Sequence, residues 1–231
     1  MSAANLSHRH IAIVIVLAIV LLGFAFRLPH LDQRPMRTDE AVQAVKTGEL
    51  AATGHYIYDP NDFHGPTLPY LSLPSIWLHA GGDSVRATAV PYRIVPFIFG
   101  LGLILLMIAV EDGLGWRAVM VAAGFTAISP AMTYYSRYYI HETLLVFFSF
   151  LCIAAGWRYV VTKKTRWAVA CGVSLGLMHA TKETCILAFA SFAAALVLTV
   201  RIERHDGGGK AKLSELLKSK PILLAAGAGL A

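Results

Sequence analysis

The chain has 231 residues, of which 56% are hydrophobic and only 15% are charged. A soluble domain is typically about half apolar and a quarter charged, so the composition argues against a soluble domain. The net charge of +6 does not indicate a nucleic-acid partner. The basic residues lie in short stretches between long uncharged runs, where they set the orientation of a membrane protein.

Five uncharged runs approach the roughly 20 residues that a helix needs to cross a bilayer. These runs are 11–26, 94–110, 118–136, 143–157 and 184–200. The first follows basic Arg9, as a signal peptide would, but no small-x-small cleavage site follows it, so we expect a retained helix. The sequence therefore predicts an all-α polytopic membrane protein.

The three cysteines are odd in number and all lie in apolar runs, at Cys152, Cys171 and Cys185. This placement is typical of packing residues that face lipid or the core. It does not indicate a disulfide framework or a metal site.

Two strongly basic segments, 158–166 and 201–220, are expected in the cytoplasm together with the N-terminus, because positive loops stay inside. The chain must then cross the membrane an even number of times before residue 158. Four candidate spans satisfy this requirement: 11–26, 93–110, 117–133 and 141–160.

The apolar stretch 66–80 would break this parity. It is short and contains Pro69 and Pro74, which disrupt a helix interior, so we expect a re-entrant or interfacial element. The stretch 167–200 is too long for one span and is expected to form two helices that turn at 181–184. A further helix from Pro221 brings the expected total to about seven.

This topology places three polar segments on the extracytoplasmic face: the first loop at about 27–92, the loop 134–142 and the turn at 182–183. Ionisable residues gather in these segments. Charged residues at membrane depth are costly, and they therefore suggest function.

The first candidates are Asp39 and Glu40. Thr38 is expected to cap a helix over 39–53 that ends at Gly54, which places both carboxylates in the first turn. The helix dipole favours negative charge there, so plain capping electrostatics is one explanation and a catalytic carboxylate is another.

Candidates also occur in two turns. His64 lies in a loop rich in turn formers, before Pro66, which suits the first turn of a helix; this histidine could bind a phosphate, a metal or nothing. Lys182 and Glu183 either serve the function or neutralise each other.

The segment 129–142 contains four tyrosines, at 134, 135, 138 and 139. An aromatic belt at the membrane interface explains the tyrosines. It does not explain Arg137, or Glu142 at the start of an apolar run, where exposure to lipid would be costly.

The order and spacing of these motifs resemble the GT-C glycosyltransferases. The branch is that of the dolichyl-phosphate-mannose protein mannosyltransferases and aminoarabinose transferases, and within it the flippase activity-associated proteins. The motifs that carry the resemblance are Arg37-Thr38-Asp39-Glu40, His64-Gly65-Pro66, Tyr92-Arg93-Ile94, Ser129-Pro130 with Tyr134-Tyr135-Ser136-Arg137, and Lys182-Glu183.

The resemblance implies a polyprenyl- or dolichyl-phosphate sugar donor, an inverting transfer to an acceptor hydroxyl, and an active site outside the cytoplasm. Asp39 matches the proposed general base, and Glu142 a second acidic residue. Relatives often have His-Pro-Pro or Lys-Pro-Pro near the lipid phosphate, whereas this chain has His64-Gly65-Pro66. A divalent metal ion is a possible cofactor. The expected substrate-binding residues are Arg37, Glu40, His64, Arg137, Lys182 and Glu183.

The resemblance covers nearly the whole chain, but such enzymes are much longer. We therefore expect residues 1–231 to be the N-terminal part of one GT-C-like module. The apolar run 221–231 at the end is about half the length of a membrane span. A transporter or a lipid-linked sugar flippase component is the alternative, and a structural membrane partner is the third reading. Transporters usually place their site near the midplane, whereas the candidates here cluster at one face.

Overall fold

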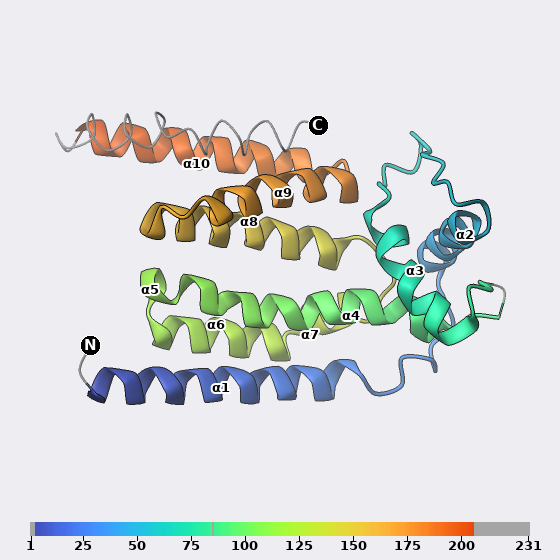
Figure 1. Ribbon diagram of the computed structural model, residues 1–231, viewed down its shortest axis with the longest axis horizontal. Helices are drawn as coiled ribbons and strands as arrows, with labels where there is room; N and C mark the ends of the chain where they lie inside the picture. The colour runs from blue at the N-terminus through green and yellow to red at the C-terminus, as the bar shows by residue number, and fades with distance from the viewer. Residues whose placement is uncertain (1–2, 85, 206–231) are drawn as a thin grey trace.

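The computed structural model describes residues 3–84 and 86–205, which form helices and no β-strand. Most of the helices run side by side along the long axis (Figure 1). They are α1 (Ala3–Arg27), α4 (Ala89–Leu106), α6 (Trp116–Ile128), α8 (Glu142–Thr162), α9 (Thr165–Thr181) and α10 (Cys185–His205). The helix predicted from Pro221, and residues 206–220 of the second basic segment, lie outside the described residues.

Three helical segments in the described part of the chain are long and apolar enough to cross a membrane: Arg9–Arg27, Ala89–Leu114 and Glu142–Thr162. Two apolar helices are shorter, Trp116–Ile128 and Cys185–Thr199. The prediction of an all-α polytopic membrane protein is confirmed.

The expected span 117–133 is wrong as a single helix. It is divided into α6 and the short helix α7 (Pro130–Tyr135), with Ser129 between them. Pro130 has no N–H and its ring clashes with the preceding turn, so it starts a new helix and cannot continue α6. The Ser129 hydroxyl caps this new start by accepting the Met132 N–H at 3.4 Å.

The two ends of the bundle differ in the segments they carry. One end holds the start of α1, the short helix α5 (Glu111–Leu114), which continues α4 through a 3-10 turn η1 (Met107–Val110), and the connection at Lys163–Lys164. The other end holds the long α1–α4 connection, the loop before α8 and the α9–α10 turn (Figure 1). The predicted grouping of the polar segments away from the 158–166 segment is confirmed.

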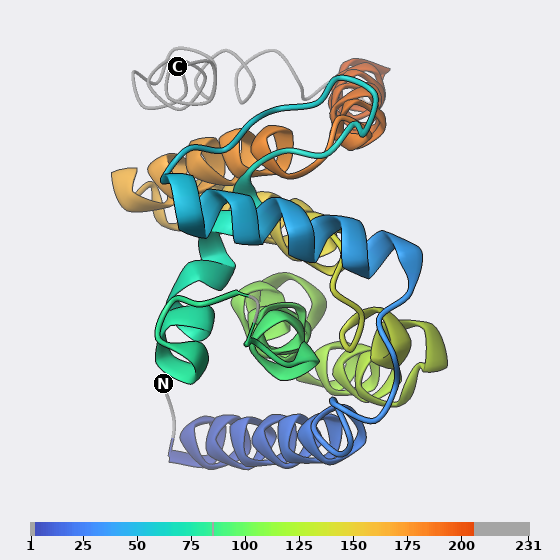
Figure 2. The same ribbon diagram turned by 90° about the vertical axis from the view of Figure 1, so that its right-hand side faces the viewer.

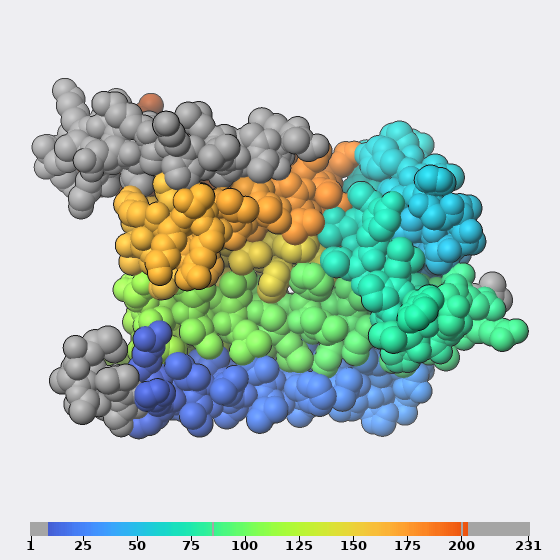
Figure 3. All heavy atoms as spheres, viewed as in Figure 1, coloured from blue at the N-terminus to red at the C-terminus, as the bar shows by residue number. Residues whose placement is uncertain are grey.

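Two helices, α2 (Thr38–Thr53) and α3 (Thr67–Ala80), cover this second end. Figure 2 views the end directly and shows α2 lying across it, and Figure 3 shows both helices as a layer over the ends of the bundle. The stretch expected to be interfacial is therefore a helix, with Pro74 inside it, that does not extend along the bundle.

The ends of α2 differ in part from the prediction. Gly54 ends the helix as expected, in the left-handed conformation at φ 73°. Thr38 is not the cap: Arg37 occupies the N-cap position and no side chain of a cap residue bonds to the helix start. The Glu40 carboxylate instead accepts the Arg37 main-chain N–H at 3.3 Å, which is one half of a capping box.

Glu40 is fully buried and forms a two-point ion pair with Arg93 at the start of α4. Nε and Nη2 of Arg93 donate to the two carboxylate oxygens, each at 2.8 Å. Glu40 also accepts from Nη2 of Arg34 at 2.9 Å and from the main-chain N–H of Tyr139 at 2.9 Å. One carboxylate therefore ties together the α1–α2 connection, α2, α4 and the loop before α8.

A second buried arginine joins α1 to α6. Arg27, at the end of α1, donates to the main-chain carbonyls of Ala127 and Thr126, both at 2.8 Å. The last carbonyls of a helix have no partner within the helix. Arg27 satisfies two of them in α6 at the point where Ser129-Pro130 interrupts it.

We expect Glu40→Gln to lower the free energy of unfolding by about 3–5 kcal/mol, because it leaves Arg93 buried with no counter-charge. Burial raises the pKa of Glu40, but the bonds from Arg93 and Tyr139 and the charges of Arg93 and Arg34 lower it more, so it lies below its ordinary value. The ionised Glu40 therefore stabilises the fold fully at a pH above the ordinary pKa of a glutamate. This stabilisation is lost as the pH falls through the lower pKa that Glu40 has in the folded protein. Thermal unfolding in detergent at neutral and acidic pH measures both effects.

Glu49→Gln is the matched control, because Glu49 lies exposed on the same helix. A Glu40→Gln protein as stable as this control at neutral pH would contradict the anchoring role of Glu40.

Candidate functional site

A cavity of about 260 Å³ lies where α2 faces the start of α8 and the α9–α10 turn. Four of the residues predicted from the sequence meet in its wall, although they come from four separate segments of the chain. The polar residues of the wall are Asp39, Gln43, Asp62, His64, Glu142 and Lys182.

Asp39 is the exposed carboxylate of this cavity. It lies on one face of α2 with Val42 and Gln43, because residues three and four apart are neighbours on a helix. Its neighbour Glu40 points a different way and is buried in the ion pair with Arg93. The hydroxyl of Tyr138 lies 3.5 Å from Oδ2 of Asp39. The two neighbouring carboxylates therefore have different roles. Asp39 faces the cavity, and Glu40 fixes the helix.

Lys182 and Glu142 form an ion pair in the wall, with Nζ of Lys182 2.6 Å from Oε1 of Glu142. Of the two alternatives for Lys182 and Glu183, mutual neutralisation is wrong, because Lys182 pairs with Glu142. Glu183 is exposed and accepts a hydrogen bond from the hydroxyl of Tyr58. Oε2 of Glu142 is buried and has no partner among the described residues.

His64 is held beside Lys182 by main-chain hydrogen bonds. Gly65 N–H donates to the carbonyl of Thr181 at 3.0 Å, and Glu183 N–H donates to the carbonyl of Phe63 at 3.3 Å. His64 and Lys182 thus form an isolated antiparallel bridge. This pairing fixes the positions of His64 and Lys182 relative to each other through main-chain atoms.

His141 packs against the loop that carries His64 and Gly65. Sequence reasoning missed this residue. It is fully buried directly before α8, its ring stacks on His64 with centroids 4.6 Å apart, and Nε2 lies 3.2 Å from the carbonyl of Gly65. Burial, helped by the charge of His64, lowers the pKa of His141 to about 3. It is therefore neutral at physiological pH. Its position next to Glu142 was the one available signal.

Asp62 forms a second polar group at the cavity with Lys46 and Gln43, which sequence reasoning also missed. Oδ2 of Asp62 accepts from Nζ of Lys46 at 2.6 Å and from Nε2 of Gln43 at 3.1 Å. Burial raises the pKa of Asp62, but these two bonds and the charge of His64 lower it more, so Asp62 is ionised. The spacing of Gln43 and Lys46, four and seven residues after Asp39, was the signal that they share its helix face.

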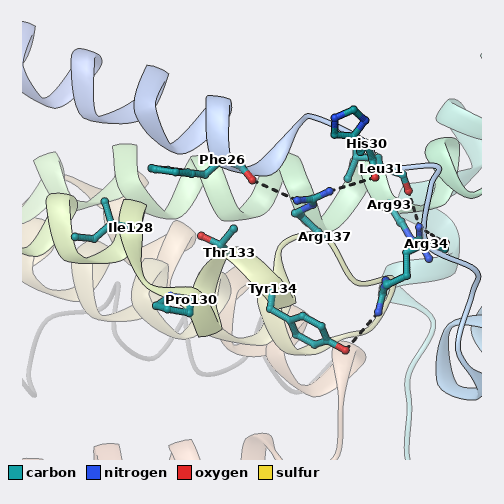
Figure 4. Close-up of a pocket in the computed structure, with 10 residues that line it drawn as sticks. All are labelled: Phe26, His30, Leu31, Arg34, Arg93, Ile128, Pro130, Thr133, Tyr134 and Arg137. Atoms are coloured by element: carbon teal, nitrogen blue, oxygen red, sulfur yellow. Dashed lines mark hydrogen bonds between the residues drawn. The ribbon is translucent and has the colours of Figure 1, made fainter.

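A separate, larger pocket of about 480 Å³ lies beside the end of α1 and contains Arg137 (Figure 4). Nη2 of Arg137 donates to the carbonyls of Pro29 and His30, at 2.5 and 3.2 Å. Arg34 and Arg93 line the same pocket. The structure therefore does not bring Arg137 into the cavity of Asp39.

The remaining predicted residues also lie outside that cavity. Arg37 is exposed at the start of α2 and Glu40 is enclosed by its donors. The aromatic-belt interpretation of the tyrosines is wrong for Tyr138 and Tyr139, which are 5% and 0% exposed. The hydroxyl of Tyr139 bonds to Ser72 at 2.9 Å and to Thr47 at 2.8 Å, inside the protein.

The donor set of the cavity does not fit a divalent metal ion. In residues 3–84 and 86–205, no three side chains of His, Cys, Asp or Glu are grouped so that they could hold one. The three cysteines are free, with the sulfurs of Cys152 and Cys171 3.5 Å apart between α8 and α9, which confirms their expected packing role.

Gly65→Ala is expected to lower the free energy of unfolding by about 1–3 kcal/mol, the usual range for overpacking, and to weaken the function of the cavity. A Cβ atom at this position would overlap the main-chain carbonyl of Ala180, so the loop with His64 must move away from Lys182. Thermal unfolding and the activity of the purified protein measure the two effects. Gly54→Ala, at an exposed turn with open space around it, should leave the activity unchanged; equal activity of Gly65→Ala would contradict the close packing.

Comparisons with known proteins agree with this architecture. No curated protein sequence matches the chain. The crystal structure of ArnT from Cupriavidus metallidurans in the apo state has the same fold over 97% of this chain, with a TM-score of 0.68 and 16% sequence identity. The chain covers 41% of that protein. The sequence profile described as dolichyl-phosphate-mannose-protein mannosyltransferase matches residues 72–222, which is more than half of the chain. The chain therefore belongs to the dolichyl-phosphate-mannose-protein mannosyltransferase family, and its predicted resemblance to the GT-C membrane glycosyltransferases is confirmed.

Proposed function

We propose that this chain holds the catalytic base of a membrane glycosyltransferase. The enzyme moves a sugar from polyprenyl or dolichyl phosphate to an acceptor hydroxyl on the extracytoplasmic face. One observation carries the proposal: the exposed carboxylate of Asp39 shares a cavity with Lys182 and His64 at one end of a membrane bundle. This cavity combines a base with the cation Lys182 where a lipid-borne phosphate can reach them.

In the proposed reaction Asp39 takes the proton of the acceptor hydroxyl. The acceptor oxygen forms a bond to the anomeric carbon of the sugar while the bond from that carbon to the phosphate oxygen breaks. The bonding electrons leave with the lipid phosphate. One base is sufficient for this direct displacement, which inverts the anomeric configuration, and base catalysis of this kind contributes roughly 10²–10⁴-fold.

Lys182 is the proposed partner of the leaving phosphate. Its ammonium group has three donors, of which one is directed to Glu142, so it can bind phosphate while it remains paired. His64 lies beside it through the main-chain bridge, with Nδ1 3.3 Å from Oδ1 of Asp62, and its ring is a second polar group near the phosphate. Charge-assisted bonds of this kind are about twice as strong as neutral ones. Arg37, Glu40, Arg137 and Glu183 lie outside the cavity, so this proposal gives them no contact with the reacting groups.

A transporter or flippase component remains the alternative function. Such proteins place their polar site near the bilayer midplane, between broken helices. The cavity here is built at the end of the bundle, between α2, the start of α8 and a turn, which favours transfer chemistry at an interface.

Asp39→Asn is expected to lower the transfer rate by roughly 10²–10⁴-fold, because the amide cannot accept the proton. It should change the unfolding temperature little, because Asp39 is exposed and the helix dipole stabilises an exposed charge by only about 0.3–1 kcal/mol. Transfer of radiolabel from a polyprenyl-phosphate sugar in membranes measures the rate. Asp32→Asn is the control, since Asp32 is an exposed carboxylate that does not line the cavity. More than about a tenth of the wild-type rate would exclude Asp39 as the base.

Cysteine labelling tests the proposed orientation. A cysteine introduced at Asp32, in the α1–α2 connection, should react with a membrane-impermeant maleimide added to intact cells, whereas one at Lys163 should react only after the membrane is opened. The two positions lie at opposite ends of the bundle (Figure 1). Reaction at position 163 in intact cells would reverse the topology and with it the face on which transfer occurs.

A further inference from the structure

Gln43 is a buried residue of the cavity wall that the proposed reaction does not use. It lies one helical turn after Asp39 on the same face of α2 and is 3% exposed. Its Nε2 lies 3.1 Å from Oδ2 of Asp62, and this oxygen also accepts from Lys46 at 2.6 Å. Gln43 is therefore held by a network that contains a full ion pair.

This network fixes the orientation of the Gln43 side-chain amide. An ionised carboxylate only accepts hydrogen bonds, so the NH₂ group of Gln43 must face Asp62. The rotation that would exchange the two ends of the amide would bring two acceptors together. Lys46 strengthens this preference because it keeps Asp62 ionised and in place.

The oxygen of the Gln43 amide is consequently left without a partner. Oε1 is buried and no donor among the described residues reaches it. Buried polar atoms are nearly always hydrogen-bonded, and an unsatisfied acceptor is costly. An acceptor held in this state beside a cavity calls for a donor from a ligand.

Glu142 provides a second free acceptor oxygen, on a side chain that is 37% exposed. Its Oε1 is taken by Lys182, while Oε2 is buried and unpartnered in the described part of the chain. Two free acceptor oxygens thus occur in the wall that contains Asp39. The matching ligand carries several hydroxyl donors. The cavity volume of about 260 Å³ lies just below the roughly 300–1,000 Å³ typical of small-molecule sites, which suits one sugar ring.

We propose that Oε1 of Gln43 accepts a hydrogen bond from one hydroxyl of the transferred sugar, so that Gln43 determines which sugar is used. Asp62 and Lys46 are positioning residues that hold the amide in the required orientation. A sugar that lacks this hydroxyl leaves the buried acceptor unpaired, which is the strongest way a site rejects a close analogue. The inference rests on the proposed function and adds a specificity residue to it.

The test compares wild type and Gln43→Met in membranes that contain the full-length protein. The substrates are a panel of polyprenyl- and dolichyl-phosphate hexoses and pentoses and, for the sugar that is transferred, a set of analogues that each lack one hydroxyl. For one analogue, wild type should lose about tenfold or more in kcat/KM, as expected for an unpaired buried acceptor. Gln43→Met should use this analogue and the parent donor about equally, and should keep the wild-type response to every other analogue.

Gln33→Met is the matched control, because Gln33 is exposed in the α1–α2 connection and should show the wild-type pattern. Asp62→Asn should weaken discrimination at the same hydroxyl as Gln43→Met, because it frees the amide to rotate. A general structural defect would lower the rate with all analogues alike and would not select one hydroxyl.

The outcomes separate the inference from the function on which it rests. If wild type transfers a sugar but Gln43→Met keeps the full wild-type pattern of discrimination, the role of Gln43 is wrong and the proposed function stands. If wild type transfers no sugar of the panel, the proposed function is overturned and the inference with it.

Discussion

The buried ion pair between Glu40 and Arg93 is the interaction on which the position of the site depends. Removing two charges from water is costly, and the cost is recovered only when every donor and acceptor is satisfied. Here both oxygens of Glu40 accept from Arg93, and the main-chain N–H of Tyr139 and the side chain of Arg34 complete the set. The pair thereby fixes the rotation of α2 about its axis, and this rotation turns Asp39 toward the cavity.

The rest of the site is assembled at the membrane end by main-chain contacts and by packing between helices. Within lipid the backbone must form all of its hydrogen bonds internally. The non-helical segments that carry His64 and Lys182 therefore lie at the end of the bundle. There they pair with each other through Gly65 and Thr181. Neutral His141 packs beneath this pairing on the side of the bundle. A charged residue in that buried position would cost much desolvation free energy. The cavity therefore has polar walls and lies at the end of an apolar helical bundle. This arrangement suits a substrate with a lipid tail and a polar head.

Much of this arrangement was predictable because it follows from hydropathy and parity. The uncharged runs gave the long helices, and counting crossings between basic segments placed Asp39, Glu142 and Lys182 at the same end. The break after Ser129 was visible as Ser-Pro, but the continuous apolar run favoured a single span. The cap of α2 was misplaced by one residue because its stabilising partner is the side chain of Glu40 and no local hydroxyl contributes.

The finer design of the site was not predictable, since it depends on pairings between distant segments. Nothing local indicates that the backbone of Tyr139 meets Glu40, or that Asp62 orients Gln43. A tyrosine in a row of tyrosines is typical of an interface, yet Tyr139 is a core residue that joins Ser72 and Thr47. Each of these contacts requires the fold before it can be recognised.

The bridge between His64 and Lys182 also constrains the lengths of two loops. Because main-chain atoms form it, the identity of Phe63 or Glu183 matters less than the number of residues on either side. An extra residue within 55–61 can be absorbed, since this stretch is largely exposed. An insertion between Phe63 and Pro66, or between Thr181 and Cys185, would shift the pairing by one position and turn His64 or Lys182 out of the cavity. Among related chains, loop length at these two points is therefore a better guide to a preserved site than the residues that fill them.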